Sequence, residues 1–162
     1  MASVNEEVGR RLLAKKARLA VAESCTGGLI AKLVTDIAGS SDWFDRGLVT
    51  YSNASKQDLL GVPMGILARH GAVSRETAEA MARGLLVMTP ADWGVAVTGI
   101  AGPGGGSPEK PVGLVWFAWA HRGGAVETES RQFPGTREQI REAAAEAALQ
   151  GLLVRLGATG AD

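Results

Sequence analysis

The sequence predicts a single-domain α/β sandwich with a mixed central sheet flanked by helices. Short apolar runs of strand length alternate with segments whose apolar residues recur every three or four positions, as on one face of a helix. Two strand-like runs follow each other late in the chain, joined by a glycine turn at residues 122–124, which predicts a hairpin. Alternating helices and strands favour parallel pairing, and the hairpin adds an antiparallel part.

The first half of the chain predicts three helices and two strands. An opening helix places Val4, Val8 and Leu12 on one face, and residues 19–22 form a buried strand. A second helix begins near Thr26 and ends before Gly39. After a loop at residues 40–45, a strand covers residues 48–51, and a short helix runs from an Asn53 cap through residue 60, before Gly61 and Pro63.

The second half predicts two more helices and the remaining strands. Ser74 is expected to cap a helix with apolar positions at residues 78, 81, 85 and 86, and residues 94–98 form a third strand. A glycine-rich loop occupies residues 99–108. Strands at 112–120 and 125–133 form the hairpin, and Thr136 with Gln139 makes a capping box for an alanine-rich closing helix. With no repeat or linker, residues 1–162 read as one domain.

Composition limits the function classes. The 162 residues include 46% apolar and 21% charged residues, and the 17 basic and 17 acidic side chains cancel. A scattered, balanced charge gives no electrostatic footprint for nucleic acid or for an anionic membrane surface, whereas a small anionic metabolite needs only one or two cations. Cys25 is the only cysteine, so no intrachain disulfide forms. Because residues 1–11 do not resemble a signal peptide and no apolar run reaches ~20 residues, we expect a cytoplasmic protein without a membrane span.

Ser24 stands at the predicted turn from the first strand into the second helix. Ligands bind where strands end and helices begin, and unpaired N–H groups at a helix N-terminus can stabilise an oxyanion. Gly27 and Gly28 allow another group to approach this backbone closely. The alternative is that Ser24 or Thr26 only caps the helix. Cys25 is a rival nucleophile, although a lone cysteine is more often a small buried hydrophobe.

Lys56 falls in the first turn of the helix expected after Asn53. The helix dipole disfavours a cation there, and the same field with partial burial lowers a lysine pKa toward the neutral amine that a general base requires. An exposed surface lysine is the alternative. The loop at residues 99–106 contains neither a Walker A nor a dinucleotide-binding pattern, so it is either a binding loop or a flexible one.

The sequence gives little support for a metal site or a catalytic triad. His70 and His121 lie in unrelated segments without a carboxylate at ligand spacing, so we expect no metal and no cofactor. Glu23 is expected to orient a polar network beside Ser24. Arg137 and Arg141 share one face of the last helix, where they either hold a phosphate or pair with neighbouring glutamates.

Together these segments resemble the CinA C-terminal domain family, the group of nicotinamide-nucleotide amidases. The matching stretches, in the family order, cover nearly the whole chain: AESCTGGLIAKLVTDIAGSSDWF, GLVTYSNASKQDLLGV, HGAVSRETAEAMARG, AVTGIAGPGGGSPEKPVGLVWFA and FPGTREQIREAAAEAAL. Many family members carry this domain behind a larger N-terminal domain. This shorter chain is similar to the stand-alone form.

The resemblance implies hydrolysis of the carboxamide of nicotinamide mononucleotide to nicotinic acid mononucleotide and ammonia, without a metal. It implies that Ser24 is the nucleophile and Lys56 its base, with Tyr51 and Thr98 in the active site. The candidate substrate-binding residues are Glu23, Thr26, Gly27, Gly28, Asn53, Gly99, Gly102, Arg137 and Arg141. The alternative is a nucleotide-binding module without turnover. A homodimer is also expected, because the apolar strand at residues 114–119 reads as exposed.

Overall fold

A mixed sheet of five strands in the order β2-β1-β3-β4-β5 forms the centre of the computed structural model, which describes residues 2–158. β1 pairs in parallel with both β2 and β3, whereas β3, β4 and β5 pair antiparallel. The predicted α/β class and mixed sheet are therefore confirmed. The strands are β1 (Leu19–Glu23), β2 (Phe44–Val49), β3 (Trp93–Gly99), β4 (Leu114–His121) and β5 (Val126–Gln132).

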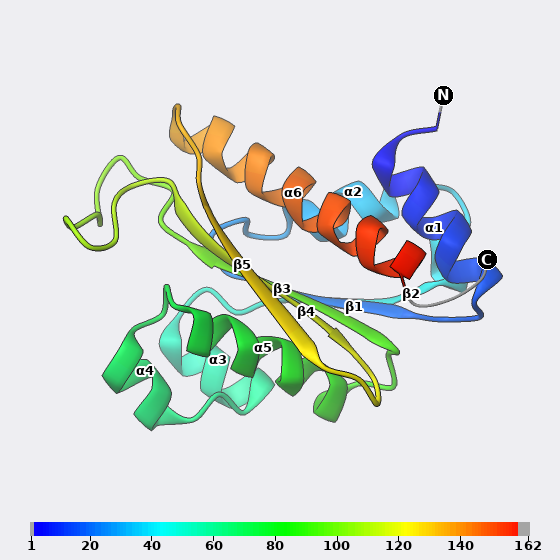
Figure 1. Cartoon of the computed structure of the whole chain (residues 1–162), viewed down its shortest axis with the longest axis horizontal. Helices are drawn as coiled ribbons and strands as arrows, with labels where there is room; N and C mark the ends of the chain where they lie inside the picture. The colour runs from blue at the N-terminus through cyan, green and yellow to red at the C-terminus, as the bar shows by residue number, and fades with distance from the viewer. Residues whose placement is uncertain (1, 159–162) are drawn as a thin grey trace.

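Helices cover both faces of the sheet (Figure 1). α1, α2 and α6 lie on one face, and α3, α4 and α5 lie on the other (Figure 1). No helix in residues 2–158 combines the length and the apolar character that crossing a bilayer requires. The helices are α1 (Val4–Ala14), α2 (Leu29–Thr35), α3 (Asn53–Leu60), α4 (Met64–His70), α5 (Arg75–Met88) and α6 (Arg137–Ala158), with a 3-10 turn at Ser40–Asp42.

The buried positions of β1, β3 and β4 present large side chains to one face of the sheet and small ones to the other. On β1, Leu19 and Val21 belong to the core beneath α1, α2 and α6, while Ala20 and Ala22 belong to the core beneath α3–α5. β4 repeats the pattern, with Phe117 facing the first core and Ala118 the second. Because side chains alternate along a strand, this pattern lets α5 approach the sheet closely while bulky residues fill the wider side.

Several predicted boundaries are wrong. α2 begins at Leu29 rather than near Thr26, β2 ends at Val49 rather than continuing to residue 51, and the cap of α3 is Ser52 rather than Asn53. α4 has no counterpart in the prediction, because seven residues carry too short an apolar pattern. The predicted cap of α5 is confirmed, since the Ser74 hydroxyl accepts a hydrogen bond from the next turn of the helix.

The strand at residues 114–119 is not exposed, contrary to expectation. β4 lies between β3 and β5, and four of its eight residues in succession are buried. Trp119 is 2% exposed, and its indole N–H donates to the carbonyl of Ala148 in α6 at 3.0 Å. The homodimer stays a prediction, but this strand no longer supports it.

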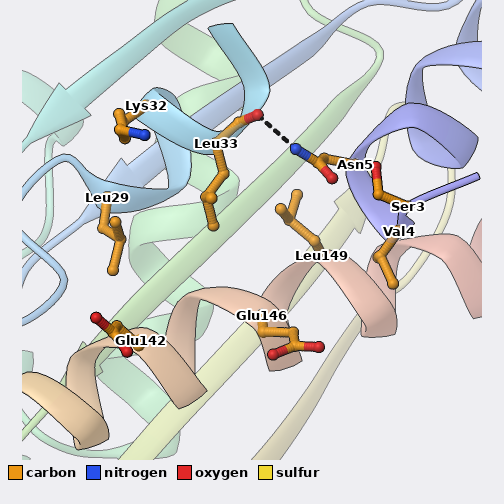
Figure 2. Close-up of a pocket in the computed structure, with 9 residues that line it drawn as sticks. All are labelled: Ser3, Val4, Asn5, Leu29, Lys32, Leu33, Glu142, Glu146 and Leu149. Carbon is orange, nitrogen blue, oxygen red and sulfur yellow. Dashed lines mark hydrogen bonds between the residues drawn. The ribbon is translucent and has the colours of Figure 1, made fainter. Parts of the chain in front are cut away.

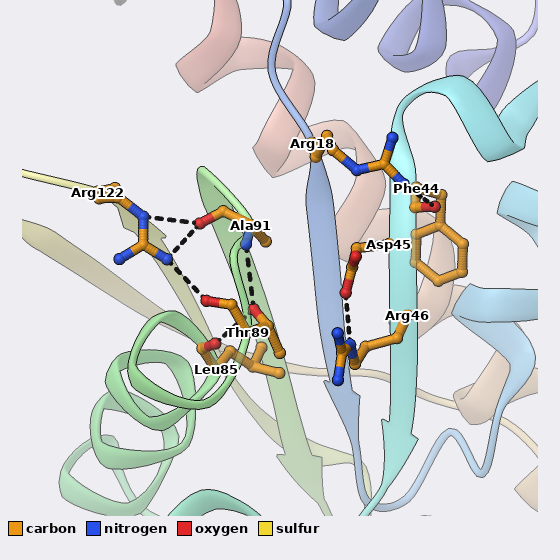
Figure 3. Close-up of polar contacts among 8 residues, drawn as sticks. All are labelled: Arg18, Phe44, Asp45, Arg46, Leu85, Thr89, Ala91 and Arg122. Carbon is orange, nitrogen blue, oxygen red and sulfur yellow. Dashed lines mark hydrogen bonds and ion pairs between the residues drawn. The ribbon is translucent and has the colours of Figure 1, made fainter.

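Arginines form hydrogen bonds at the edge of the sheet where the parallel strands begin. This edge lies opposite the site described below. Arg18, just before β1, donates to the carbonyl of Phe44 at the start of β2, at 3.2 Å (Figure 3). Arg122 donates to the carbonyls of Thr89 and Ala91, between α5 and β3, at 2.9 and 2.6 Å (Figure 3). These contacts satisfy carbonyls at the start of β2 and in the connection that follows α5. Asp45, whose side chain is half-buried, pairs with the neighbouring Arg46.

Candidate active site

The carboxyl ends of β1 and β3 meet at the point where the strand order reverses. The chain leaves β1 toward β2 through α2 on one face, and reaches β3 through α3–α5 on the other. Such a switch point leaves a crevice outside the strand ends, where α/β proteins bind their ligands. A cavity of about 180 Å³ lies there, lined by Ser24, Cys25, Tyr51, Lys56, Ala72, Val73, Thr98, Gly99, Ala101 and Arg137.

The side chains predicted as nucleophile and base meet in this cavity. Lys56 Nζ lies 3.1 Å from Ser24 Oγ, and the two residues are 1% and 8% exposed. Nζ also donates to the carbonyl of Thr50 at 2.8 Å and to that of Tyr51 at 3.4 Å. Both carbonyls belong to the segment between β2 and α3, so the lysine folds back from α3 onto the end of its own connection.

A capping box fixes the start of α3 and hence the position of Lys56. Ser52 Oγ accepts from the N–H of Ser55 at 3.0 Å, and Ser55 Oγ accepts from the N–H of Ser52 at 3.1 Å. Lys56 is therefore the fourth residue of α3. Asn53 is exposed and does not line the cavity, so its predicted roles as cap and as substrate contact are not supported.

Burial shifts the pKa values of two groups beside Ser24: the candidate base Lys56 and the rival nucleophile Cys25. Burial lowers the pKa of Lys56, and its three hydrogen-bond acceptors are neutral oxygens. Burial also raises the pKa of the Cys25 thiol to about 11. A cysteine acts as a nucleophile through its thiolate, so this shift disfavours Cys25 relative to Ser24.

The turn after Ser24 differs from the predicted helix start. The buried Glu23 carboxylate accepts from the N–H groups of Ile30 and Ala31 at 2.9 and 3.0 Å, so it caps α2 and does not face the cavity. The N–H of Gly27 donates to the carbonyl of Ser24 at 3.1 Å, so it is not free to stabilise an oxyanion. Among the backbone–backbone hydrogen bonds of residues 2–158, none is donated by the N–H of Cys25 or Thr26. These two groups are therefore the candidate oxyanion donors of the turn.

Three further polar side chains line the cavity: Thr98, Arg137 and Tyr51. Thr98, at the end of β3, donates its hydroxyl to the carbonyl of Ala72 at 2.8 Å and so joins the α4–α5 connection to the sheet. Arg137, at the start of α6, donates to the Tyr51 hydroxyl at 3.0 Å and to the carbonyl of Gly102 at 2.7 Å. Gly102 therefore contributes to the site through Arg137 rather than by lining the cavity.

Arg141 lies outside the cavity. Its guanidinium donates to the carbonyls of Cys25 and Thr26, at 3.0 and 3.2 Å. The predicted phosphate contact by this residue is therefore not supported. Gly27 and Gly28 do not line the cavity, and the fully buried side chain of Thr26 does not enter it, so only the backbone N–H of Thr26 is left as a candidate contact.

The sequence prediction missed the contribution of the α4–α5 connection. Ala72 and Val73 line the cavity, and two backbone carbonyls hold the lysine. Neither kind of residue carries a chemical signal in the sequence, because an apolar wall and a peptide oxygen can come from any residue type.

A second, larger cavity of about 520 Å³ opens between α1, α2 and α6 (Figure 2). Its apolar floor includes Leu29 and Leu149, with charged Lys32, Glu142 and Glu146 at its rim (Figure 2). It contains no serine–base or cysteine–base contact, so the chemistry is assigned to the smaller cavity.

The histidines take no part in either cavity described above. His121 stacks on Trp93, with ring centroids 4.4 Å apart, and His70 Nδ1 lies 3.7 Å from a Glu76 carboxylate oxygen on the surface. Within residues 2–158, no group of three histidine, cysteine or acidic side chains is arranged to hold a metal ion.

Fold and site together define a class: single-sheet α/β proteins that carry a buried serine–lysine pair where their parallel strands end. The chain belongs to the CinA C-terminal domain family, whose model matches residues 1–156. This confirms the resemblance inferred from the sequence motifs.

Named relatives cover most of the chain. It is 56% identical over 147 residues to the nicotinamide-nucleotide amidohydrolase PncC of Enterobacter agglomerans, covering 91% of this chain and 90% of that protein. The PncC protein of Escherichia coli K12 is 52% identical over 149 residues, with 92% and 90% covered. A CinA-like protein of Akkermansia muciniphila is 51% identical over 94% of this chain, which spans only 37% of that longer protein.

Solved structures share the whole architecture. The competence damage-inducible protein A of Klebsiella pneumoniae superposes with a TM-score of 0.93 at 39% identity, covering 97% of both chains. The competence/damage inducible protein CihA of Agrobacterium tumefaciens gives a TM-score of 0.88 at 48% identity, covering 97% of this chain and 98% of that one.

Proposed function

We propose that this protein hydrolyses the carboxamide of nicotinamide mononucleotide to nicotinic acid mononucleotide and ammonia. The observation that carries the proposal is the buried 3.1 Å contact between Lys56 Nζ and Ser24 Oγ in the wall of the cavity. The names of relatives at 52% and 56% identity, nicotinamide-nucleotide amidohydrolases, supply the reaction and the substrate.

The contacts of Lys56 suit a general base. A neutral amine has two N–H donors and one lone pair. If the carbonyls of Thr50 and Tyr51 receive the two N–H groups, at 2.8 and 3.4 Å, the lone pair is left for the hydroxyl proton of Ser24. Burial lowers the pKa of Lys56 and so favours this neutral form. The lowered pKa and the two carbonyl contacts thus both favour the protonation state and orientation that proton abstraction needs.

The reaction proceeds in two balanced steps. Lys56 takes the hydroxyl proton while Ser24 Oγ bonds to the amide carbon, and the oxyanion accepts from the N–H groups of Cys25 and Thr26. The protonated lysine then gives its proton to the amide nitrogen, the C–N bond breaks and ammonia leaves an acyl-serine ester. Water attacks this ester with Lys56 again as base, which releases the carboxylic acid and restores the Ser24 hydroxyl.

The volume of the cavity limits which part of the substrate fits inside it. A volume of about 180 Å³ is small for a drug-sized ligand, whose pockets span roughly 300–1,000 Å³. We therefore place the pyridine carboxamide inside, and the ribose and phosphate at the mouth. Arg137 stands there, exposed, and uses two of the five guanidinium N–H donors for Tyr51 and Gly102. The remaining donors of this side chain are proposed to contact the phosphate.

The test is ammonia release from nicotinamide mononucleotide by purified protein. We expect ammonia from the wild type, with losses of several orders of magnitude in Ser24→Ala and Lys56→Ala. Ser130→Ala, on the exposed strand β5, is the matched control and should behave as the wild type.

Two outcomes would redirect the proposal. A wild type that binds the nucleotide without releasing ammonia is a binding module instead. Full activity in Ser24→Ala would remove the nucleophile assignment and make Cys25 the next candidate. A cytoplasmic location, a homodimer and the lack of nucleic-acid binding stay predictions.

A further inference from the structure

α6 carries two arginines one turn apart whose surroundings differ. Arg137 is exposed and lines the cavity, whereas Arg141 is half-buried behind the turn that follows Ser24. Arg141 Nε donates to the carbonyl of Cys25 at 3.0 Å, and its Nη2 donates to the carbonyl of Thr26 at 3.2 Å. One guanidinium thus holds two successive peptide groups of this turn.

The glycine that follows makes this approach feasible. Gly27 has φ +59°, a left-handed conformation that other residues rarely adopt, and a Cβ built on it would lie 3.0 Å from Arg141 Nη2. Its N–H closes the turn by donating to the carbonyl of Ser24 at 3.1 Å. The turn is therefore fastened from inside by its own backbone and from outside by α6.

Peptide geometry connects this clamp to the site. In a trans peptide the C=O and N–H groups point in opposite directions, so holding the carbonyl of Cys25 toward Arg141 directs the N–H of Thr26 away from α6. The charged bond to that carbonyl also polarises the peptide, which strengthens the N–H as a donor. The N–H groups of Cys25 and Thr26 are the two proposed to receive the oxyanion.

We infer that Arg141 is a positioning residue: its guanidinium holds the turn after Ser24 so that the N–H groups of Cys25 and Thr26 form the oxyanion site. The inference rests on the proposed amidase function. It gives the two arginines different tasks. Arg137 would contact the ground-state substrate at the cavity mouth, while Arg141 would act only on the charge that develops in the transition state.

Steady-state kinetics with nicotinamide mononucleotide separate these tasks. Arg141→Met should lower kcat by roughly 10²-fold, the cost of an ångström-scale misplacement, with little change in KM. Arg141→Lys should lose kcat similarly, because a lysine keeps the charge but lacks the planar fork that joins two carbonyls. Arg137→Met should mainly raise KM. Glu138→Gln, an exposed neighbour on α6, is the control and should leave both constants unchanged.

Thermal melts of each variant accompany the kinetics. If Arg141→Met does not fold, Arg141→Lys and Gly27→Ala carry the test, since an alanine at Gly27 displaces the same turn from the other side. The inference is overturned if Arg141→Lys keeps the wild-type kcat, or if folded Arg141 or Gly27 variants raise KM with kcat unchanged. Ammonia release by the wild type is measured first. If the wild type releases none, the proposed function itself is wrong, and the variants no longer test the role of Arg141.

Discussion

Replacing Lys56 with methionine tests the centre of the proposed chemistry. Methionine is similar in length and apolar, so it suits a position that is only 1% exposed, but it cannot accept a proton. A positioned general base contributes roughly 10²–10⁴ in rate. The 3.1 Å contact with Ser24 Oγ and the two carbonyls that orient Nζ favour the middle of that range, a loss of roughly 10³, or about 4 kcal/mol in kcat/KM.

The pH dependence gives the same experiment a second readout. Burial lowers the pKa of Lys56, and the amine must be neutral to act. Wild-type kcat/KM should therefore fall as the pH drops through this lowered pKa, since the protonated lysine has no lone pair. The residual rate of Lys56→Met should lack this acid limb. Initial rates of ammonia release across the pH range measure both effects.

A matched control and one refuting result complete the design. Lys32→Met removes an exposed lysine of α2 that pairs with Asp36 at 2.7 Å, and should leave the pH profile unchanged. The reasoning fails if Lys56→Met stays within a few-fold of the wild type, or if the acid limb persists in that variant. Either result would place the base elsewhere.

The remaining predictions concern stability and the rival nucleophile. A Cβ on Gly84 in α5 would lie 2.1 Å from the backbone oxygen of Leu60, so Gly84→Ala should destabilise the fold by roughly 1–3 kcal/mol and lower Tm in a thermal melt. Gly65→Ala in α4 is its control: the site is open, so alanine should stabilise by up to about 1 kcal/mol, and equal Tm shifts would contradict the packing argument. Cys25→Ala should retain most of the ammonia release, because burial raises the thiol pKa to about 11; loss of activity in a folded variant would reinstate Cys25.

Much of the fold can be predicted from the sequence because it depends on interactions between residues that are close in the chain. The closing helix is an example: the predicted capping box is present, with the N–H of Thr136 donating to Gln139 Oε1 at 2.9 Å and the N–H of Gln139 donating to Thr136 Oγ at 3.2 Å. The cap at Ser74 and the hairpin between β4 and β5 likewise follow from local chemistry.

The sequence prediction is wrong where segments distant in the chain determine the start of a helix or the burial of a strand. α2 starts late because its first free N–H groups are taken by Glu23, seven and eight residues earlier in the chain. β4 looked exposed because its apolar residues are continuous, yet it is interior since β5 pairs along its outer edge. A strand buried on both faces and a strand exposed on one cannot be separated without knowing its neighbours.

The same division holds in the candidate site. The sequence by itself determined the family motifs and the residue types at Ser24 and Lys56, because chemistry resides in side chains. Only the tertiary structure decided that the two meet at 3.1 Å, since 32 residues separate them and the carboxyl edge of the sheet brings them together. It also decided the tasks of Arg137 and Arg141. They share a helix face in the sequence pattern, but one turn of α6 separates the mouth of the cavity from the backbone behind it.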